Sequence, residues 1–181
     1  MKVLYFTRDF SPHDERFLTA LGTSGHEIFL LRLEPSQPVQ LPAGIREVSL
    51  SSAETESQDI FTGLARKLTE LINSLNPDVI HAGPLHGPAY IAALTRFPRL
   101  VSMSWGADIL HDGEVDTDAR RKIHNALDQS AVFVCDCLAV ADKATNEYGF
   151  PAERIFRFPW GVDLSHFTPA GRTDIRKKLG W

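Results

Sequence analysis

A short run after an apolar segment carries side chains suited to recognition and proton transfer. The run Trp105-Gly106-Ala107-Asp108 begins at the last residue of segment 99–105, which reads "RLVSMSW". Trp105 offers a flat apolar face of the kind that stacks on sugar rings. Gly106 would let backbone approach a ligand or a neighbouring loop. Asp108 stands where a proton acceptor would sit, although it could equally cap a short helix, so both roles stay open.

A second candidate group occupies the loop "TRDFSPHDER" near the start of the chain. Asp9, His13, Asp14 and Arg16 offer side chains suited to sugar hydroxyls or a phosphate. The loop holds no glycine, whereas a dinucleotide site places a glycine-rich turn here so that bare backbone can approach the pyrophosphate. The loop therefore argues against a dinucleotide site. Ser11 or Asp14 could also cap the helix that follows.

Histidines and cysteines give no pattern typical of a metal centre. His81 ends an apolar run in "HAGPLHG", and neither Cys, Asp nor Glu stands at metal-ligand spacing around it. His81 could be a hydrogen-bonded structural residue or could touch a substrate. Cys135 and Cys137 lack the two intervening residues of redox pairs, and they are too close to staple a fold. We expect no metal, and buried structural cysteines in a reducing cytosol.

The elements that must position these residues alternate along the chain. Short apolar runs predict strands, and apolar residues at helical spacing predict helices between them. Helix stop signals support the boundaries, including Gly25 and Gly149, and Asp136 is a plausible N-cap. The expected strands are 3–6, 26–33, 45–50, 77–83, 99–105, 131–135 and 154–158, and the expected helices are 13–25, 61–75, 88–94, 115–127 and 136–149.

This alternation predicts the fold class. Six or seven strands separated by helices indicate a Rossmann-like three-layer α/β/α sandwich with a mostly parallel sheet. Ligands bind such sheets outside the carboxyl ends of the strands, at a topological switch point. The candidate side chains all follow predicted strands, in the loops 7–14, 81–88, 104–113, 135–137 and 158–163.

Composition restricts the classes of function. The chain has 181 residues, 43% of them hydrophobic and 23% charged, which is typical of one globular domain. A net charge of -4 gives no support for nucleic-acid binding, which would need a basic stripe. The first apolar run is too short for a signal peptide, and no run is long enough for a membrane span. We expect a cytoplasmic protein.

Four segments, taken in order, resemble one enzyme family. They are "LGTSGHEIFLL", "PDVIHAG", "WGAD" and "YGFPAERIFRFPWGVDLSHFTP". Together they look like the family 4 glycosyltransferases, which are built on the GT-B plan of two Rossmann-like domains. The resemblance spans nearly the whole chain, and the last segment is its most specific part.

The resemblance implies an activity. Such enzymes transfer a sugar from a nucleotide-sugar to an acceptor hydroxyl with retention of anomeric configuration, usually without a metal. No cofactor is implied; the nucleotide-sugar is a co-substrate, held mainly by the C-terminal domain. Residues 1–165 would form the N-terminal acceptor-binding domain. Residues 166–181 would be the linker and the start of a C-terminal donor-binding domain that is missing, so we expect this fragment alone to be inactive.

The resemblance also assigns site residues. His81 matches the first histidine of the family's His-x-His, and Trp105 replaces the histidine of its His-Gly-x-Asp. Asp108 matches the aspartate and becomes the first candidate for a catalytic contact. Gly161 and Asp163 match the junction motif and would form a hinge and the rim of the interdomain cleft. The first loop lacks the family's Gly-Gly pair and would contact substrate differently.

Partners and alternatives follow from the same pattern. The acceptor could be a sugar, a glycolipid or another small hydroxyl compound, and the chain's own C-terminal domain is a further partner. The family allows peripheral association with the inner membrane face. Apolar surface left by the missing domain could make the fragment a homodimer.

A flavodoxin-like receiver module and half of a sugar-nucleotide epimerase remain alternatives. Asp9 and Asp14 could imitate a receiver's acidic cluster, but no strand-end Asp with a following Lys completes it.

Overall fold

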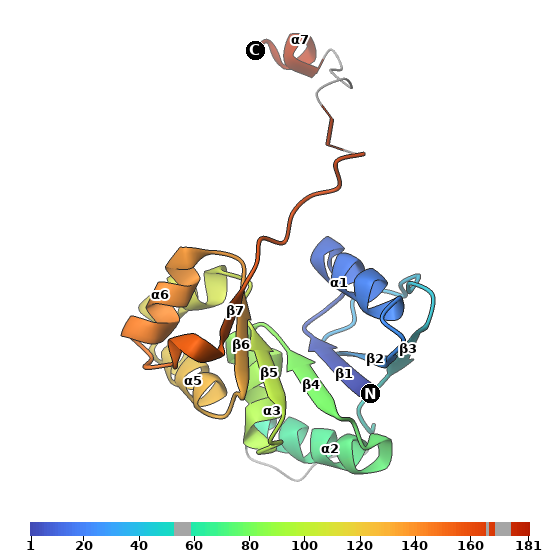
Figure 1. Cartoon of the computed structure of the whole chain (residues 1–181), viewed down its shortest axis with the longest axis vertical. Helices are drawn as coiled ribbons and strands as arrows, with labels where there is room; N and C mark the ends of the chain where they lie inside the picture. Colours follow the sequence, from blue (N-terminus) through green and yellow to red (C-terminus); the bar gives the residue numbers. More distant parts are fainter. Residues whose placement is uncertain (53–58, 166, 169–174) are drawn as a thin grey trace.

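The computed structural model describes residues 1–52, 59–165, 167–168 and 175–181. Its centre is a seven-stranded sheet in the order β3-β2-β1-β4-β5-β6-β7, with every described pair parallel. The predicted fold class is confirmed (Figure 1). The strands are β1 (Lys2–Thr7), β2 (Glu27–Arg32), β3 (Ile45–Val48), β4 (Val79–Ala82), β5 (Leu100–Met103), β6 (Val132–Cys135) and β7 (Ile155–Arg157).

Helices cover both faces of the sheet, but unequally. The face formed by side chains such as Leu4 and Phe6 carries most of the described helices, whereas α1 contributes Leu18 to the core of the opposite face. The helices of the first face are α2 (Ile60–Leu75), η1 (Leu85–Ala89), α3 (Tyr90–Leu94), η2 (Asp108–Asp112), α4 (Gly113–Val115), α5 (Thr117–Asp128) and α6 (Leu138–Asn146); α1 is Pro12–Gly22, η3 is Ala152–Arg154 and α7 is Ile175–Leu179.

The two cores follow from strand geometry. Successive side chains of a strand point to opposite faces, so Leu4 and Phe6 enter one core while Val3 and Tyr5 enter the other. All four are buried, which matches the continuous apolar runs expected of a central parallel strand. β3 lies at the sheet edge, as the alternating pattern of residues 45–50 predicted.

The structure corrects three helix boundaries, the first two at Pro88 and Asp136. The helix expected to start at Pro88 begins at Leu85, as a π-helical turn that contains the proline. The Ala89 N–H reaches back five residues to the carbonyl of Pro84 at 3.2 Å, and this wider turn accommodates a proline that donates no hydrogen bond of its own. Asp136 is not an N-cap, because α6 starts at Leu138 after an extended Cys137 that makes no side-chain cap.

The third correction is at Val115: the single helix expected from this residue is divided into two helices, α4 and α5. Asp116 is extended and accepts a hydrogen bond from the Asp118 N–H at 2.8 Å, so a new helix, α5, starts after it. Val115 therefore lies in the separate short α4 with 71% of its surface exposed. Ala119, Ile123 and Leu127 are buried as the apolar spacing predicted.

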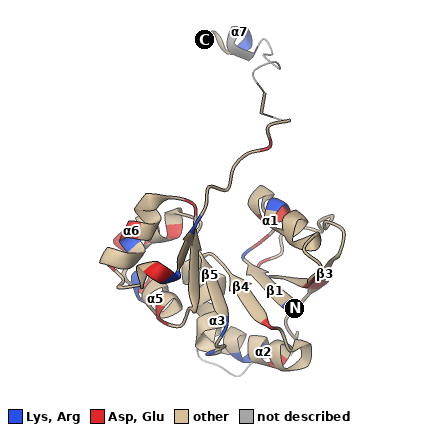
Figure 2. Ribbon diagram, in the orientation of Figure 1, with Lys and Arg blue, Asp and Glu red and all other residues tan. Residues whose placement is uncertain are grey.

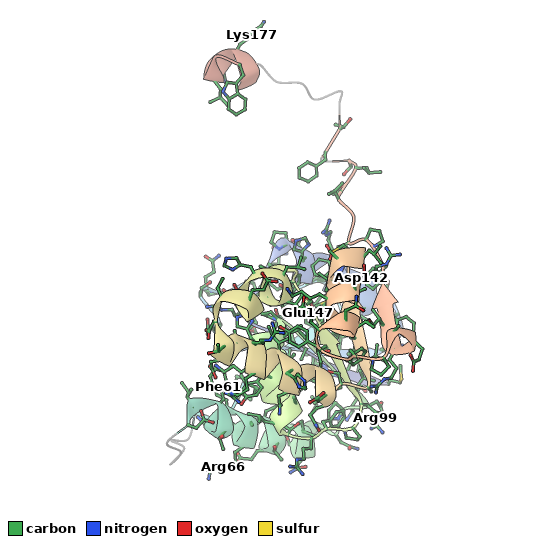
Figure 3. All side chains as sticks on the ribbon, turned by 90° about the vertical axis from the view of Figure 1, so that its left-hand side faces the viewer. Phe61, Arg66, Arg99, Asp142, Glu147 and Lys177 are labelled. Carbon is green, nitrogen blue, oxygen red and sulfur yellow. The ribbon has the colours of Figure 1, made fainter. Side chains whose placement is uncertain are left out.

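After β7 the chain leaves the body of the domain. Trp160 still packs against the domain, whereas the described residues from Val162 to Ser165 are exposed. Figure 1 shows this segment rising away from the sheet toward α7. In Figure 3 Lys177 of α7 lies far from Asp142 of α6. The division into residues 1–165 and 166–181 stays a prediction.

The surface carries charges of both signs. Figure 2 shows acidic and basic residues interspersed along the helices, in keeping with the small net charge of -4. Among the residues that the structure describes, no helix is both long enough and apolar enough to cross a membrane.

Candidate functional site

The candidate site lies where the strand order reverses. The chain moves outward from β1 to β2 and β3, then returns to the other side of β1 with β4. A cavity of about 470 Å³ lies at the carboxyl ends of these strands, as expected for a ligand site in a parallel sheet. It is lined by residues 7–11, 13 and 14 after β1, by Glu34 and Ser36 after β2, by Pro84 after β4 and by Trp105 after β5.

The loop after β1 is fixed by a reciprocal cap. The Ser11 hydroxyl accepts a hydrogen bond from the Asp14 N–H at 3.3 Å, and the Asp14 carboxylate accepts one from the Ser11 N–H at 2.8 Å. Asp14 also accepts a hydrogen bond from the Tyr5 hydroxyl at 2.9 Å and is only 1% exposed. The possibility that Ser11 or Asp14 caps the helix is confirmed, while a contact between Asp14 and substrate stays a prediction.

Asp9 is held at the outer side of the cavity. Its Oδ1 accepts hydrogen bonds from the Phe10 N–H at 2.8 Å and from Arg32 at 3.1 Å. Its Oδ2 accepts from the Ser36 hydroxyl at 2.6 Å and from the Ser36 N–H at 3.3 Å. These bonds, that of the Ser36 hydroxyl above all, lower the pKa of Asp9 to about 2. Asp9 is therefore an anion with its acceptor sites occupied.

An aromatic cluster contributes His13 and Trp105 to the lining of the cavity. The Trp105 ring meets that of Trp160 edge-on at 4.8 Å between centroids, and the His13 ring lies 5.5 Å from Trp105 and 5.2 Å from Trp160. Phe17 of α1 completes the cluster at 5.6 Å from Trp160. The structure thus brings His13 and Trp105, predicted from separate segments, to one side of the cavity.

Arg16 connects α1 to the chain that follows β7. Its guanidinium donates a 2.7 Å hydrogen bond to the Gly161 carbonyl and a 2.8 Å bond to Nδ1 of His13. Gly161 has a φ of +64°, a left-handed conformation that favours glycine.

Asp163 accepts hydrogen bonds from the N–H and the hydroxyl of Ser165 at 2.8 and 2.6 Å. A larger hollow of about 860 Å³ lies between α1 and residues 161–163 and 167. Roles for Gly161 and Asp163 as hinge and rim stay predictions.

Asp108 is buried and does not line the cavity. It is 2% exposed and accepts hydrogen bonds from the Leu85 N–H at 2.8 Å, the Ser104 hydroxyl at 2.5 Å and the Ile109 N–H at 2.9 Å. Burial raises the pKa of Asp108, and the hydrogen bonds oppose that rise. Gly106, with a φ of +87°, makes the turn between Ser104 and Asp108. A catalytic contact by Asp108 stays a prediction.

His81 lies on the face of β4 beside Tyr5. The two rings meet at 5.2 Å between centroids, and Nε2 of His81 is inaccessible, with no hydrogen-bond partner among the described residues. Desolvation lowers the pKa of His81 to about 4, so the ring is neutral at pH 7. His81 does not line the cavity, and its contact with substrate stays a prediction.

The cysteines behave as structural residues. Cys135 is fully buried, and burial raises the pKa of its thiol to about 11, so the helix that follows does not activate it. Cys137 is half-buried, and both thiols are free.

Nowhere in the described ranges do three His, Cys, Asp or Glu side chains gather as a metal site would need. The expectation of a metal-free site stays a prediction.

Sequence reasoning missed three residues that shape the site. Ser104 stands four positions before Asp108, a spacing that lets a hydroxyl reach back to the carboxylate, so its role could have been recognised. Trp160 lies in the junction segment "PWG", where an aromatic residue beside a turn is a visible signal. Ser36 lies in a proline-rich loop, and nothing in that loop points to its contact with Asp9.

The fold and the cavity define a Rossmann-like α/β domain with a ligand-sized hollow at its switch point. Residues 2–135 match the family model described as "Glycosyl transferase 4-like". The chain belongs to this family, which confirms the resemblance to family 4 glycosyltransferases.

Comparisons with individual proteins agree with this assignment. The chain is 25% identical to a D-inositol 3-phosphate glycosyltransferase from Pseudarthrobacter chlorophenolicus, over 90% of this chain and 44% of the relative. Its fold matches Anabaena HepE in complex with UDP (TM-score 0.65, 16% identity, covering 99% of this chain and 50% of that one). It also matches a UDP-N-acetylglucosamine 2-epimerase from Rickettsia bellii (TM-score 0.61, 16% identity, 99% and 51%). The chain thus spans about half the length of these relatives.

Proposed function

We propose that this chain is the acceptor-binding half of a GT-B glycosyltransferase that transfers a sugar from a nucleotide-sugar to an acceptor hydroxyl with retention of configuration. The supporting observation is the 470 Å³ cavity at the switch point, which has Trp105 as one wall, in a chain of this family. On this proposal residues 1–165 form the acceptor domain and residues 166–181 lead to a donor-binding domain. The fragment alone is inactive because it lacks the donor site.

The reaction needs no cofactor or metal for its bonds to balance. The bond between the anomeric carbon and the leaving phosphate oxygen breaks, and a bond to the acceptor oxygen forms on the same face. The acceptor proton passes to an oxygen of the leaving phosphate. Closure of the two domains would exclude water from the reacting atoms. The acceptor is a sugar, a glycolipid or another small hydroxyl compound.

Each side chain then has a role that its surroundings allow. Trp105 offers its ring to the acceptor, and exposed His13 offers a polar ring edge beside it. Asp9 acts through its charge, since a carboxylate has about four acceptor sites and the protein's own donors make four bonds to it. Asp108 is a positioning residue that holds the loops after β4 and β5, because its oxygens bond the buried framework.

Exposed apolar side chains on the edge strand support docking of a second domain. Phe156 of β7 is 61% exposed and Phe158, just after β7, is 42% exposed. Figure 1 shows the chain leaving the domain after β7. In the absence of a second domain the same surface could pair two fragments. A cytoplasmic location, with or without contact to the inner membrane face, belongs to the proposal.

The alternatives have less support. Likeness to an epimerase extends to the fold alone, at 16% identity. A receiver-type module would need a free acidic cluster after β1, but Asp14 is buried and bonded to Tyr5, and Asp9 is bound to Arg32 and Ser36. Treatment with acetyl phosphate and magnesium tests the receiver alternative, because a phosphorylated aspartate would support it.

A transfer assay tests the proposal. Residues 1–181 joined to their natural downstream sequence should release nucleoside diphosphate from a nucleotide-sugar when hydroxyl acceptors are added, and NMR of the product should show a retained anomeric configuration. The 181-residue chain alone should give no product under the same conditions. An inverted product would contradict the retaining mechanism, and equal transfer by the short chain would contradict the division of substrate sites.

A further inference from the structure

The cavity at the switch point has an unbalanced charge. Its lining contains one guanidinium, that of Arg8, and three carboxylates, those of Asp9, Asp14 and Glu34. Arg8 is paired with Glu34 at 2.9 Å across the outer rim. The lining therefore carries an excess of negative charge whenever the three carboxylates are ionised.

The usual anion-binding position in this fold is already occupied. The N-terminus of a helix that follows a strand presents free N–H groups and a positive dipole end to a phosphate. Here the chain places the carboxylate of Asp14 at that position, where it accepts from the Ser11 N–H at 2.8 Å, while the Ser11 hydroxyl accepts from the Asp14 N–H. Two N–H groups at the start of α1, those of Ser11 and Asp14, are thus already engaged and are not open to an incoming phosphate.

The cations near the cavity already make contacts within the protein, two of them with carboxylates. Arg32, which is buried, lies 3.1 Å from Asp9 and 2.7 Å from Glu47. Arg16 directs its guanidinium to the Gly161 carbonyl and to His13. Among the described residues that line the cavity, the one arginine already faces Glu34. A phosphate entering the cavity would meet carboxylates without a free cation to balance them.

We infer that this cavity takes an uncharged or amino-bearing polyhydroxyl acceptor and rejects phosphorylated ones. The inference rests on the proposed function and narrows its substrate class. On this inference the acceptor of this chain differs in charge from the D-inositol 3-phosphate that the name of one relative specifies. Trp105 would contact the ring of the acceptor, and the negative charge of the lining would favour neutral hydroxyl groups and ammonium groups over phosphate.

Titration of the isotope-labelled 181-residue chain tests the inference. The probes are glucose, glucosamine and glucose 6-phosphate, with myo-inositol and an inositol monophosphate as a second matched set. The indole signal of Trp105 should shift with the uncharged and amino sugars, and the phosphorylated partners should bind about tenfold more weakly or worse. Raising the salt concentration from about 0.01 M to about 1 M should reduce that difference, because salt screens it.

A matched pair of variants makes the test specific to charge. Glu34→Gln removes one rim carboxylate and releases Arg8, so it should strengthen glucose 6-phosphate binding by about threefold or more. The control variant Glu27→Gln removes an exposed carboxylate that is paired with Arg46. Because Glu27 lies at the start of β2, at the end of the strand opposite the cavity, this variant should leave the affinity for glucose 6-phosphate unchanged.

The outcomes separate the inference from the proposed function. Phosphorylated probes that bind as tightly as their neutral partners would overturn the charge inference and leave the acceptor cavity in place. If none of the five probes shifts the Trp105 signal, both the inference and the proposed acceptor cavity are contradicted.

Discussion

The backbone N–H of Leu85 donates a 2.8 Å hydrogen bond to Oδ2 of Asp108. This bond joins the loop after β4 to the loop after β5, on one side of the switch point. The other oxygen of Asp108 accepts from the Ser104 hydroxyl and the Ile109 N–H, at the end of the strand that delivers Trp105. The carboxylate thus connects the loop after β4 to the residues on either side of the turn that follows Trp105.

Replacing Asp108 should therefore reduce stability. Asp108→Ala leaves three buried donors without their acceptor. Each such donor costs about 1–3 kcal/mol, partly offset because a buried carboxylate is no longer desolvated, so we expect a loss of about 3 kcal/mol in the free energy of unfolding. Asp108→Asn keeps the shape and one acceptor oxygen and should lose about 1–2 kcal/mol. Urea denaturation measures both.

Asp128→Asn is the matched control for the Asp108 variants. Asp128 has 54% of its side chain exposed and pairs with His124 within α5, so its replacement should change stability by less than about 0.5 kcal/mol. Unchanged stability of Asp108→Asn, together with loss of transfer in the longer protein, would instead favour a direct catalytic contact by Asp108.

Asp9 should contribute a pH-dependent part of the stability. Its pKa falls from 3.8 to about 2 on folding, so the stabilisation is present above pH 3.8 and is lost as the pH falls toward about 2. The difference in unfolding free energy between the wild type and Asp9→Asn should shrink over that interval. The carboxyl carbon signal of Asp9 should titrate near the lower value. A difference that stays constant throughout would contradict the network around Ser36.

His81 should make the stability of the fold depend on pH in a higher range than Asp9 does. Folding lowers its pKa from 6.5 to about 4, because its surroundings disfavour the charged ring. Between these values the unfolded chain binds more protons, so stability is full above pH 6.5 and falls as the pH drops toward about 4. His81→Gln should flatten this slope in pH-dependent denaturation. A histidine ring signal that titrates near its ordinary value would show that His81 is solvated.

Arg16 should restrain the segment that leaves the domain. Arg16→Met removes the hydrogen bond to the Gly161 carbonyl while keeping an apolar stem, so residues 159–163 should become more mobile in ¹⁵N relaxation measurements. Because the contact is partly exposed, the free energy of unfolding should fall by about 1 kcal/mol or less. Arg66→Met, an exposed site on α2 labelled in Figure 3, is the control and should leave that segment unchanged. Equal mobility in both variants would exclude a restraint by Arg16.

The fold could be predicted because its signals are local. A buried parallel strand is an apolar run such as Leu4 to Phe6, and the helices between strands repeat apolar residues on one side. The error at Pro88 comes from an unusual turn, whereas those at Val115 and Asp136 come from one extended residue, Asp116 or Cys137, after which the helix starts. The first residue of that π-helical turn, Leu85, donates a hydrogen bond to Asp108, which lies 23 residues away.

The site could be predicted only in part, for the same reason. Strand ends direct attention to the correct loops, and His13 and Trp105 do meet at the cavity. Sequence does not show which way a loop side chain turns. Asp14 turns inward because the Tyr5 hydroxyl lies beneath it, and Asp108 turns inward because three donors converge on it.

The most direct measurement is the effect of Trp105→Ala on the two Michaelis constants of the longer protein, residues 1–181 with their natural downstream sequence. If the cavity beside Trp105 holds the acceptor, the KM for acceptor should rise about tenfold as the stacking surface is lost, while the KM for nucleotide-sugar changes less than about twofold. Trp181→Ala, at a site 85% exposed, serves as the control. A rise confined to the KM for nucleotide-sugar would contradict the account, since it would place the donor in this cavity.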